Sequence, residues 1–208
     1  MKKLTEISLT IAVVLLAPSL CWANAIFTLG NNPQPNEQNV LLNMGSTGNT
    51  VTGTTNTTGT TVVFTSTQTL TEPANGQARI EATNGTSQIG LTNVDFNLNG
   101  TTFTDAIFNM DVTGTIGVSG GTATITAVTN DGTFNFMTTL GNGSNFLTVT
   151  TSGGEVLESI SISYSDALGF TDLRQVRISG VPDGGTTLSL LGASLLGLGL
   201  VRRKLSRA

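Results

Sequence analysis

Alternation of apolar and polar residues runs through the middle of this chain and constrains its fold more than any other feature. Residues 61–65, 122–127, 133–136 and 159–164 read TVVFT, TATITA, TFNF and SISISY. Because successive side chains of a strand point to opposite faces, this period of two predicts strands with one apolar and one hydroxyl-rich face. No apolar period of helical length occurs between residues 26 and 180, so we expect an all-β fold.

Asn-Gly and Asp-Gly pairs separate these runs and predict tight hairpin turns. They stand at residues 75–76, 84–85, 99–100, 131–132 and 142–143. Both members of such a pair tolerate the positive φ of a type I′ turn. Many short strands joined by tight turns predict either a sandwich or a β-solenoid. Since the turns have no fixed spacing, which a solenoid requires, we expect a single antiparallel, jelly-roll-like β-sandwich over residues 26–180.

The expected core consists of the large apolar residues in strand-like contexts, because β-branched and aromatic residues favour strands. These are Phe64, Phe96, Phe103, Phe108, Phe134, Phe136, Phe146, Ile125, Ile160 and Ile162. The Thr- and Gly-rich residues 47–61 leave three interpretations open: a flexible loop, an edge strand and a glycosylated segment. Asn56, Asn84, Asn99 and Asn142 begin Asn-x-Ser/Thr sequons, and the last three also belong to Asn-Gly turns.

The N-terminal residues 1–25 predict a secretory signal peptide. Lys2 and Lys3 precede an apolar run over residues 7–20, and small residues follow at Ala23 and Ala25. Cleavage by signal peptidase after Ala23 or Ala25 fits these small residues, and Ala23-Asn24-Ala25 is the cleaner match. Acylation of Cys21 ranks second, because a bulky Leu20 precedes it. Removal of the signal would leave a mature chain without cysteine, and hence without disulfides.

The middle region is strongly acidic, and this excludes nucleic acid as a partner. Residues 26–180 carry three arginines, no lysine and 11 carboxylates, a formal net charge of −8. Nucleic-acid binding needs clustered Lys and Arg to displace counterions. The chain has no histidine, which removes His-containing triads and the commonest transition-metal ligand. We expect no cofactor, no metal and no catalytic residue.

The acidic residues of the middle region are expected to be surface groups and not catalytic ones. Glu155 and Glu158 are three apart beside a strand and should face opposite sides, and Asp105 and Asp111 flank another strand. All four are expected to be solvated surface groups. Oxygen ligands for calcium at residues 93–95 or 130–132 lack the acid density of an EF-hand and are interpreted first as turns. Sugar stacking would have to use phenylalanine, since Trp22 belongs to the signal and Tyr164 stands alone.

The C-terminal tail, residues 181–208, combines a turn motif, an apolar stretch and a basic end. Residues 186–201 carry no charge and as a helix would span about 24 Å. This is short for a bilayer core of about 30 Å, although snorkelling flanks and local thinning can close the gap. The basic cluster Arg202, Arg203 and Lys204 follows at once and should stay in the cytoplasm while the rest of the chain lies outside. We expect a transmembrane helix over residues 186–201.

This tail resembles the C-terminal sorting signal of PEP-CTERM-type proteins, and most closely its VPDSG variant. The motif residues are Val181, Pro182, Asp183, Gly184 and Gly185, and the basic stop is Arg202, Arg203 and Lys204. Gly184 stands where the variant has serine. The resemblance implies that an exosortase, a membrane-embedded transpeptidase, removes the tail and passes the protein to the cell surface or extracellular matrix. An ordinary C-terminal membrane anchor is the alternative that hydropathy alone would favour.

The sequence thus predicts a membrane-anchored precursor at the inner membrane that becomes a non-catalytic surface or matrix protein. The expected parts are a signal peptide (1–25), a β-sandwich ectodomain (26–180) and a sorting signal (181–208). The expected partners are signal peptidase and an exosortase-type enzyme, with exopolysaccharide as a further candidate. Two alternatives remain for the ectodomain: an exopolysaccharide-binding adhesin or lectin-like module, and a carboxylate-dependent hydrolase.

Overall fold

A computed structural model describes residues 24–42 and 45–180, and within these ranges the chain forms strands and no helix. The strands are β1 (Asn24–Leu29), β2 (Gln38–Leu42), β3 (Thr47–Thr55), β4 (Thr61–Thr71), β5 (Gly76–Gln77), β6 (Arg79–Thr83), β7 (Gln88–Ile89), β8 (Asn93–Leu98), β9 (Asp105–Val112), β10 (Thr122–Thr129), β11 (Gly132–Thr139), β12 (Gly143–Ser152), β13 (Leu157–Tyr164) and β14 (Asp172–Ser179). Every strand pairing is antiparallel. The expectation of an all-β antiparallel fold is confirmed.

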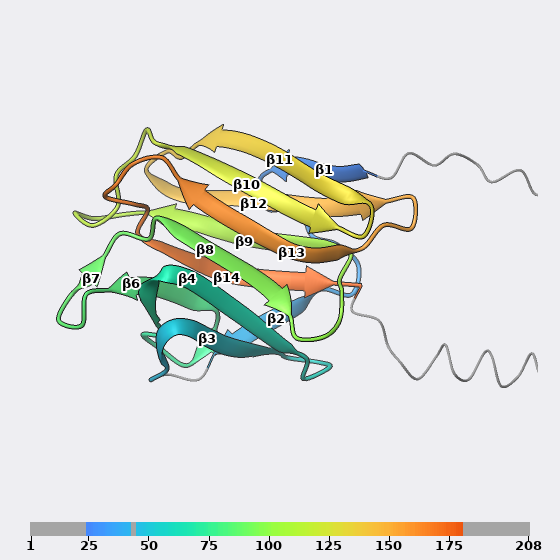
Figure 1. The fold of residues 1–208 in the computed structure, drawn as a ribbon, viewed down its shortest axis with the longest axis horizontal. Helices are drawn as coiled ribbons and strands as arrows, with labels where there is room; N and C mark the ends of the chain where they lie inside the picture. Colours follow the sequence, from blue (N-terminus) through green and yellow to red (C-terminus); the bar gives the residue numbers. More distant parts are fainter. Residues whose placement is uncertain (1–23, 43–44, 181–208) are drawn as a thin grey trace, which may run out of the picture.

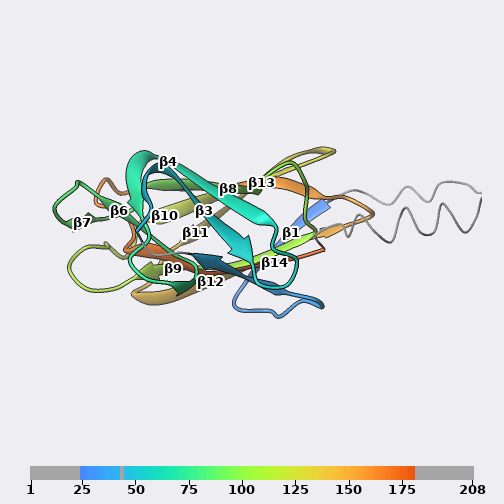
Figure 2. The same cartoon turned by 90° about the horizontal axis from the view of Figure 1, so that it is seen from below.

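The strands lie in two facing layers (Figures 1 and 2). The first layer has the order β1-β12-β9-β14, and the second has the order β3-β4-β8-β13-β10-β11. β2 pairs with β14 and with β3, while β6 pairs with β14 and with β4, so both strands join the layers along one side. On the opposite side the hydrogen-bonded path ends at β1 and β11, which are edge strands.

The core fills the space between the layers, and the alternation in the sequence decides which side chains enter it. In β10, Ala123, Ile125 and Ala127 are buried while the threonines between them are partly exposed. Of the expected core residues, Phe64, Phe96, Phe103, Phe108, Ile125, Ile160 and Ile162 are buried. Phe134 and Phe136 are only half-buried, because they stand on the edge strand β11. Phe146 is half-buried because it lies opposite Asn109, on the outer face of the first layer, so its placement in the core was wrong.

The outer face of the first layer is covered too, which the sequence did not indicate. β9 is buried at every position after Asp105, with Ile107, Asn109 and Asp111 facing away from the core. The chain over residues 30–37 crosses this face: the Asn32 backbone N–H donates to Thr148 Oγ1 (3.1 Å), and Thr148 Oγ1 donates to the Gly30 carbonyl (2.9 Å). Both faces of β9 are therefore shielded from water.

The two ends of the described chain leave the sandwich at the same end (Figure 1). Asn24 of β1 pairs with Ser152, Thr150 pairs with Asp105, and Asp105 pairs with Ser179 at the end of β14. Three strand spacings of about 4.8 Å separate β1 from β14, so roughly 14 Å lie between the two strands. Within the described ranges, no helix is long and apolar enough to cross a membrane. The expected signal peptide lies almost wholly, and the helix at 186–201 entirely, outside these ranges.

The prediction of type I′ turns is wrong. Gly76, Gly85, Gly100 and Gly143 do adopt positive φ, but within the described ranges the only non-glycine residues that do so are Asn36 and Gln175, so none of the paired Asn or Asp residues does. A type I′ turn needs positive φ at both central positions. The β10–β11 hairpin turns through residues 130–131, because Thr129 pairs with Gly132.

Part of the Thr- and Gly-rich segment at residues 47–61 forms β3, so the flexible-loop interpretation is wrong there. β3 pairs with β4 over most of its length, and its last residues also pair with β2.

Candidate functional site

The positive charges of the ectodomain gather in one place. Its three arginines are Arg79 on β6 and Arg174 and Arg177 on β14. β6 and β14 are neighbours, with Arg174 opposite Arg79 in the register. Each arginine forms an ion pair with a carboxylate. The three arginines therefore neutralise carboxylates within the fold and do not form an unpaired basic patch.

Arg174 neutralises two buried carboxylates on adjacent strands. Its Nε lies 2.5 Å from Asp172 Oδ1, and its Nη2 lies 2.9 Å from Asp111 Oδ2. Asp111 and Asp172 are opposite each other in the β9–β14 register, and Asp111 also accepts a hydrogen bond from Thr113 Oγ1 (2.6 Å). The hydrogen bond to Asp172 is the main cause that raises the pKa of Arg174 above its ordinary value.

Arg79 extends this cluster to β6. Its Nη2 lies 2.7 Å from Glu81 Oε1 and its Nε lies 3.1 Å from Asp172 Oδ2. Burial raises the pKa of Glu81, and the charge of Arg79 opposes this shift only in part. Arg79, Glu81, Asp111, Asp172 and Arg174 are called the arginine network below.

Arg177 attaches the segment 30–37 to the first layer. Its Nη1 lies 2.6 Å from Glu37 Oε2, and its Nη2 donates to Asn31 Oδ1. Both partners of the Glu37 pair are mostly buried, which makes the pair stronger than an exposed one. The segment is therefore held at both ends, by Arg177 and by Thr148.

A pocket of about 330 Å³ opens on the far side of this segment, where the edge strands β1 and β11 end. It is lined by Leu29, Gly30, Asn31, Met110, Thr138, Thr139, Leu140, Ser144, Asn145 and Phe146. Leu29 is 61% exposed, Phe146 is half-buried, and Met110 and Leu140 are buried. The pocket thus has an apolar wall and floor, with hydroxyl and amide groups around them. No charged residue lines it.

Asn145 holds the polar side of the pocket in place. Its Nδ2 donates to the carbonyls of Met110 (3.1 Å), Gly141 (2.9 Å) and Gly143 (2.9 Å), and its Oδ1 accepts from the Gly141 N–H (2.8 Å). Its own backbone N–H donates to Asn109 Oδ1 (2.7 Å). An amide with all its hydrogen bonds made within the fold is a positioning group, because little capacity is left for a ligand.

The structure separates the carboxylates that the sequence singled out. Asp111 is 2% exposed and Glu155 is 3% exposed, so the expectation that they are solvated is wrong. Glu155 Oε1 accepts a hydrogen bond from Thr129 Oγ1 (2.7 Å) because the β12–β13 turn folds over the end of β10. Glu158 is exposed and Asp105 is half-buried.

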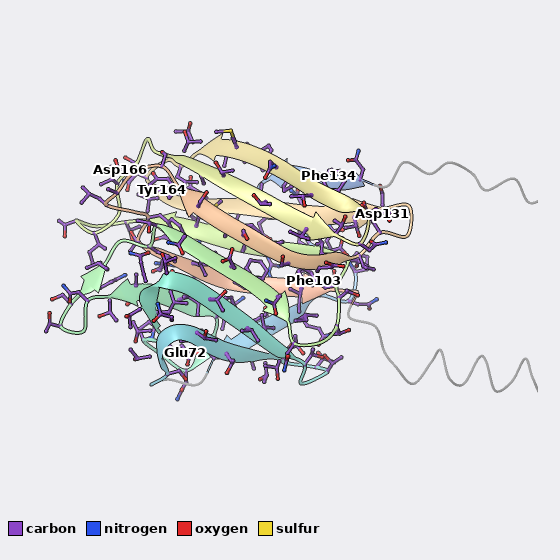
Figure 3. The ribbon with its side chains drawn as sticks, in the orientation of Figure 1. Glu72, Phe103, Asp131, Phe134, Tyr164 and Asp166 are labelled. Carbon is purple, nitrogen blue, oxygen red and sulfur yellow. The ribbon has the colours of Figure 1, made fainter. Side chains whose placement is uncertain are left out.

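Of the two candidate calcium sequences, which were interpreted first as turns, residues 93–95 lie in β8, so the turn interpretation is wrong there, and residues 130–132 belong to the β10–β11 turn. Asp131 and Asp166 lie at opposite ends of the sandwich, with Glu72 far from both (Figure 3). Asn130 Oδ1 accepts a hydrogen bond from the Val156 N–H (2.9 Å), as expected for a turn. Among the described residues, no group of three acidic, Cys or His side chains is arranged to hold a metal ion. The sequon residues Asn56, Asn84, Asn99 and Asn142 are all exposed.

Neither the arginine network nor the pocket was predicted from the sequence. The network did leave a signal, since Arg79 and Glu81, and likewise Asp172 and Arg174, are opposite charges two residues apart, on one face of a strand. The pocket left none, because β1, β11 and β12 meet there only in the tertiary structure. The sorting motif Val181, Pro182, Asp183, Gly184 and Gly185 and the basic stop Arg202, Arg203 and Lys204 lie outside the described residues.

Comparison with known proteins bears on the tail. The family model of the VPDSG-CTERM motif matches residues 180–205, which confirms the expected resemblance to a C-terminal sorting tail. No curated protein matches the chain. A similar solved structure is a mutant of CBM29-2, a family 29 carbohydrate binding module, at 13% identity over 76% of this chain and 84% of that one. Its TM-score of 0.28 is too low for any conclusion about this fold or its ligand.

Proposed function

We propose that this chain is an exported, non-catalytic surface or extracellular-matrix protein whose C-terminal tail is a temporary membrane anchor. In this proposal signal peptidase removes the N-terminal segment, and an exosortase-type enzyme at the inner membrane recognises Val181 to Gly185 and removes the tail. Arg202, Arg203 and Lys204 hold the end of the precursor on the cytoplasmic side. The match of the VPDSG-CTERM motif to residues 180–205 is the observation that carries this function.

The geometry of the domain supports a tethered precursor. The motif begins directly after β14, and the start of β1 lies at the same end of the sandwich (Figure 1). A membrane anchor at either terminus would therefore leave the opposite end of the jelly-roll-like sandwich facing away from the lipid. Asn24 and Ala25 belong to β1, and Ala25 is buried. This favours signal cleavage after Ala23, which would leave β1 whole.

The buried carboxylates support a structural role. A carboxylate-dependent hydrolase needs acids that reach a substrate. Asp111 and Asp172, the acidic pair on adjacent strands, are 2% and 0% exposed and are bound by Arg174. Their arrangement suits charge compensation inside the fold better than acid–base chemistry.

Mass spectrometry of the mature protein tests the sorting proposal. The protein is followed in cells that have the sorting enzyme, using an epitope inserted in the exposed turn at residues 84–87. We expect the wild-type protein to appear outside the inner membrane without its C-terminal residues. The paired variant Pro182→Ala with Asp183→Ala should stay in the membrane fraction at full precursor length.

One control variant accompanies this test. The variant Ser206→Ala lies beyond the basic stop and should be processed like the wild type. A mature wild-type protein that still ends at Ala208 would contradict the proposal and leave the ordinary membrane anchor as the explanation.

Binding of exopolysaccharide is the second candidate function, and the pocket at the ends of β1 and β11 favours it. A small number of polar groups beside an apolar wall is the usual make-up of a ligand site. Retention of the purified protein on a glycan array tests this candidate independently of tail processing.

A further inference from the structure

We propose that the pocket at the ends of β1 and β11 binds a neutral glycan, with Leu29 contacting the apolar face of a sugar ring. This inference rests on the second candidate function and assigns its site and ligand class.

The apolar wall of the pocket is incompletely covered. Leu29 is 61% exposed and is one of the few large apolar side chains of the described chain that face solvent to this extent. Leu29 lies opposite Leu147 in the register, on the face of the first layer that meets the core, and the buried Leu140 lines the same pocket. A ligand with an apolar face would remove the exposed surface of Leu29 from water, which is favourable at about 25 cal/mol per Å².

Polar groups with unused hydrogen-bonding capacity surround this wall. The hydroxyls of Thr138 and Thr139 make no hydrogen bond within the described part of the chain. Ser144 Oγ accepts a hydrogen bond from Asn109 Nδ2 (3.1 Å), so its own O–H can still donate. The Leu140 N–H donates inward to the Gly121 carbonyl. Because backbone groups alternate in direction along a strand, the N–H and C=O of Thr139 point to the free edge.

These groups suit a polyhydroxylated ligand. Hydroxyls both donate and accept hydrogen bonds, as the hydroxyls of a sugar do, while the C–H face of a sugar ring suits an aromatic or aliphatic wall. A volume of about 330 Å³ is at the lower end of the range for small-ligand pockets. The pocket is therefore sized for a short segment of a longer chain that extends along the open side of the sandwich.

The uncharged lining of the pocket favours a neutral ligand. The lining contains no Asp, Glu, Lys or Arg, so neither an anionic nor a cationic group would find an opposite charge there. The nearest arginine, Arg177, already binds Glu37 and Asn31. The ectodomain carries a net charge of −8, which repels acidic polysaccharides.

The pocket lies away from the end that carries the chain termini. β1 runs from Asn24 at that end to Leu29 at the pocket, about 17 Å along the strand. A precursor held by its tail, or a product attached through its C-terminus, would present the pocket outward.

Isothermal titration calorimetry of the full chain, purified in detergent, tests the proposal. The probes are the neutral hexasaccharides of glucose (β1,4), xylose (β1,4) and mannose (β1,4), with oligogalacturonate as the acidic comparison. We expect at least one neutral hexasaccharide to bind and oligogalacturonate not to bind. Leu29→Ser, at an exposed position, should weaken that binding at least tenfold.

Phe134→Ala is the control, because Phe134 is a half-buried apolar residue of the edge strand β11 that does not line the pocket. It should leave the affinity within twofold of the wild type. Failure of all three neutral hexasaccharides to bind would overturn the proposal. Binding that is unaffected by Leu29→Ser would also overturn this site, while leaving polysaccharide binding and tail processing as separate findings.

Discussion

Arg174 and Asp172, two residues apart on β14, form a bidentate ion pair in which Nε and Nη2 each lie 2.5 Å from a carboxylate oxygen. The Asp172 side chain is completely buried, whereas Arg174 retains 29% of its side-chain surface. Arg174 also pairs with Asp111 across the strand boundary. One guanidinium therefore compensates two buried carboxylates, and among the described residues Asp111 has no other ion pair, whereas Asp172 also meets Arg79.

Arg174→Met should destabilise the domain by about 3 kcal/mol, because removing one partner of a buried pair leaves an uncompensated charge. Urea unfolding at pH 7, followed by circular dichroism, measures this loss. Arg79→Met is the comparison: its side chain is 43% exposed, Asp172 keeps Arg174 as a partner, and Glu81, which loses its ion pair, has a pKa that burial already raises. We therefore expect a smaller loss of about 1 kcal/mol. Equal losses in the two variants would contradict a central role for Arg174.

Glu72→Gln should stabilise the domain at neutral pH but not in acid. Neither carboxylate oxygen of Glu72 has a hydrogen bond of normal geometry within the described residues. Burial raises the pKa of this carboxyl, and the nearby Ser46 hydroxyl and N–H lower it only in part. Between the ordinary pKa and the raised one, the folded state binds more protons than the unfolded state, so stability falls as pH rises through that window.

The measurement is the melting temperature of both proteins at pH 4 and pH 7.5. The variant should melt above the wild type at pH 7.5, where Glu72 pays the cost of a buried charge. The two should converge at pH 4, where the glutamate is mostly protonated in the folded state. A variant that melts below the wild type at pH 7.5 would show that the carboxylate is compensated.

Replacing Gln175 should separate backbone strain from side-chain contacts. Gln175 has φ of 55° at the bulge of β14, is exposed, and its N–H donates to the Ala78 carbonyl (2.8 Å). Gln175→Gly should raise the free energy of unfolding by about 0.5 kcal/mol, because glycine adopts positive φ without a Cβ clash. Gln175→Val should lower it by about 1 kcal/mol or more, since β-branched residues are the least tolerant of positive φ. Chemical denaturation measures both values, and a more stable valine variant would contradict backbone strain at this position.

Gly90→Ala should be strongly destabilising. A Cβ at Gly90 would lie 1.6 Å from the Leu168 carbonyl oxygen, which is backbone and has little freedom to move. The neighbouring hydrogen bonds between Leu91 and Phe170, at 2.7 and 3.0 Å, would have to open. We expect a loss of about 2 to 4 kcal/mol in urea unfolding. Gly132→Ala, with no neighbouring atom closer than 4.0 Å, is the control and should change stability little.

The strands that the sequence predicted well are those with strict alternation. β10 and β13 bury the apolar residues that the pattern assigned to the core, including Ile125, Ile160 and Ile162. Here the local period and the tertiary environment agree, because one face meets the core and the other meets water. β9 breaks this rule, since the segment 30–37 and the arginine network cover its second face. The expectation that Asp111 lies at the surface was therefore wrong.

The sequence predicted where the chain turns but not which turn type closes each connection. The Asn-Gly pairs do mark chain reversals or crossings, and their glycines adopt positive φ. Their asparagines do not, because the partner strand and the loop length decide which turn type closes each connection. Residues 142–143, for instance, join β11 in the second layer to β12 in the first, which is a crossing between layers and not a hairpin.

By itself the amino-acid sequence determined the all-β class, most of the core and the character of the tail, because periodicity, composition and motif are local properties that act over a few neighbouring residues. Tertiary structure decided which charges meet and where a pocket opens. Arg79 and Asp172 are 93 positions apart, and the pocket combines Leu29 of β1 with residues of β9, β11 and β12. Such contacts depend on strand order and register, which the period of two leaves open.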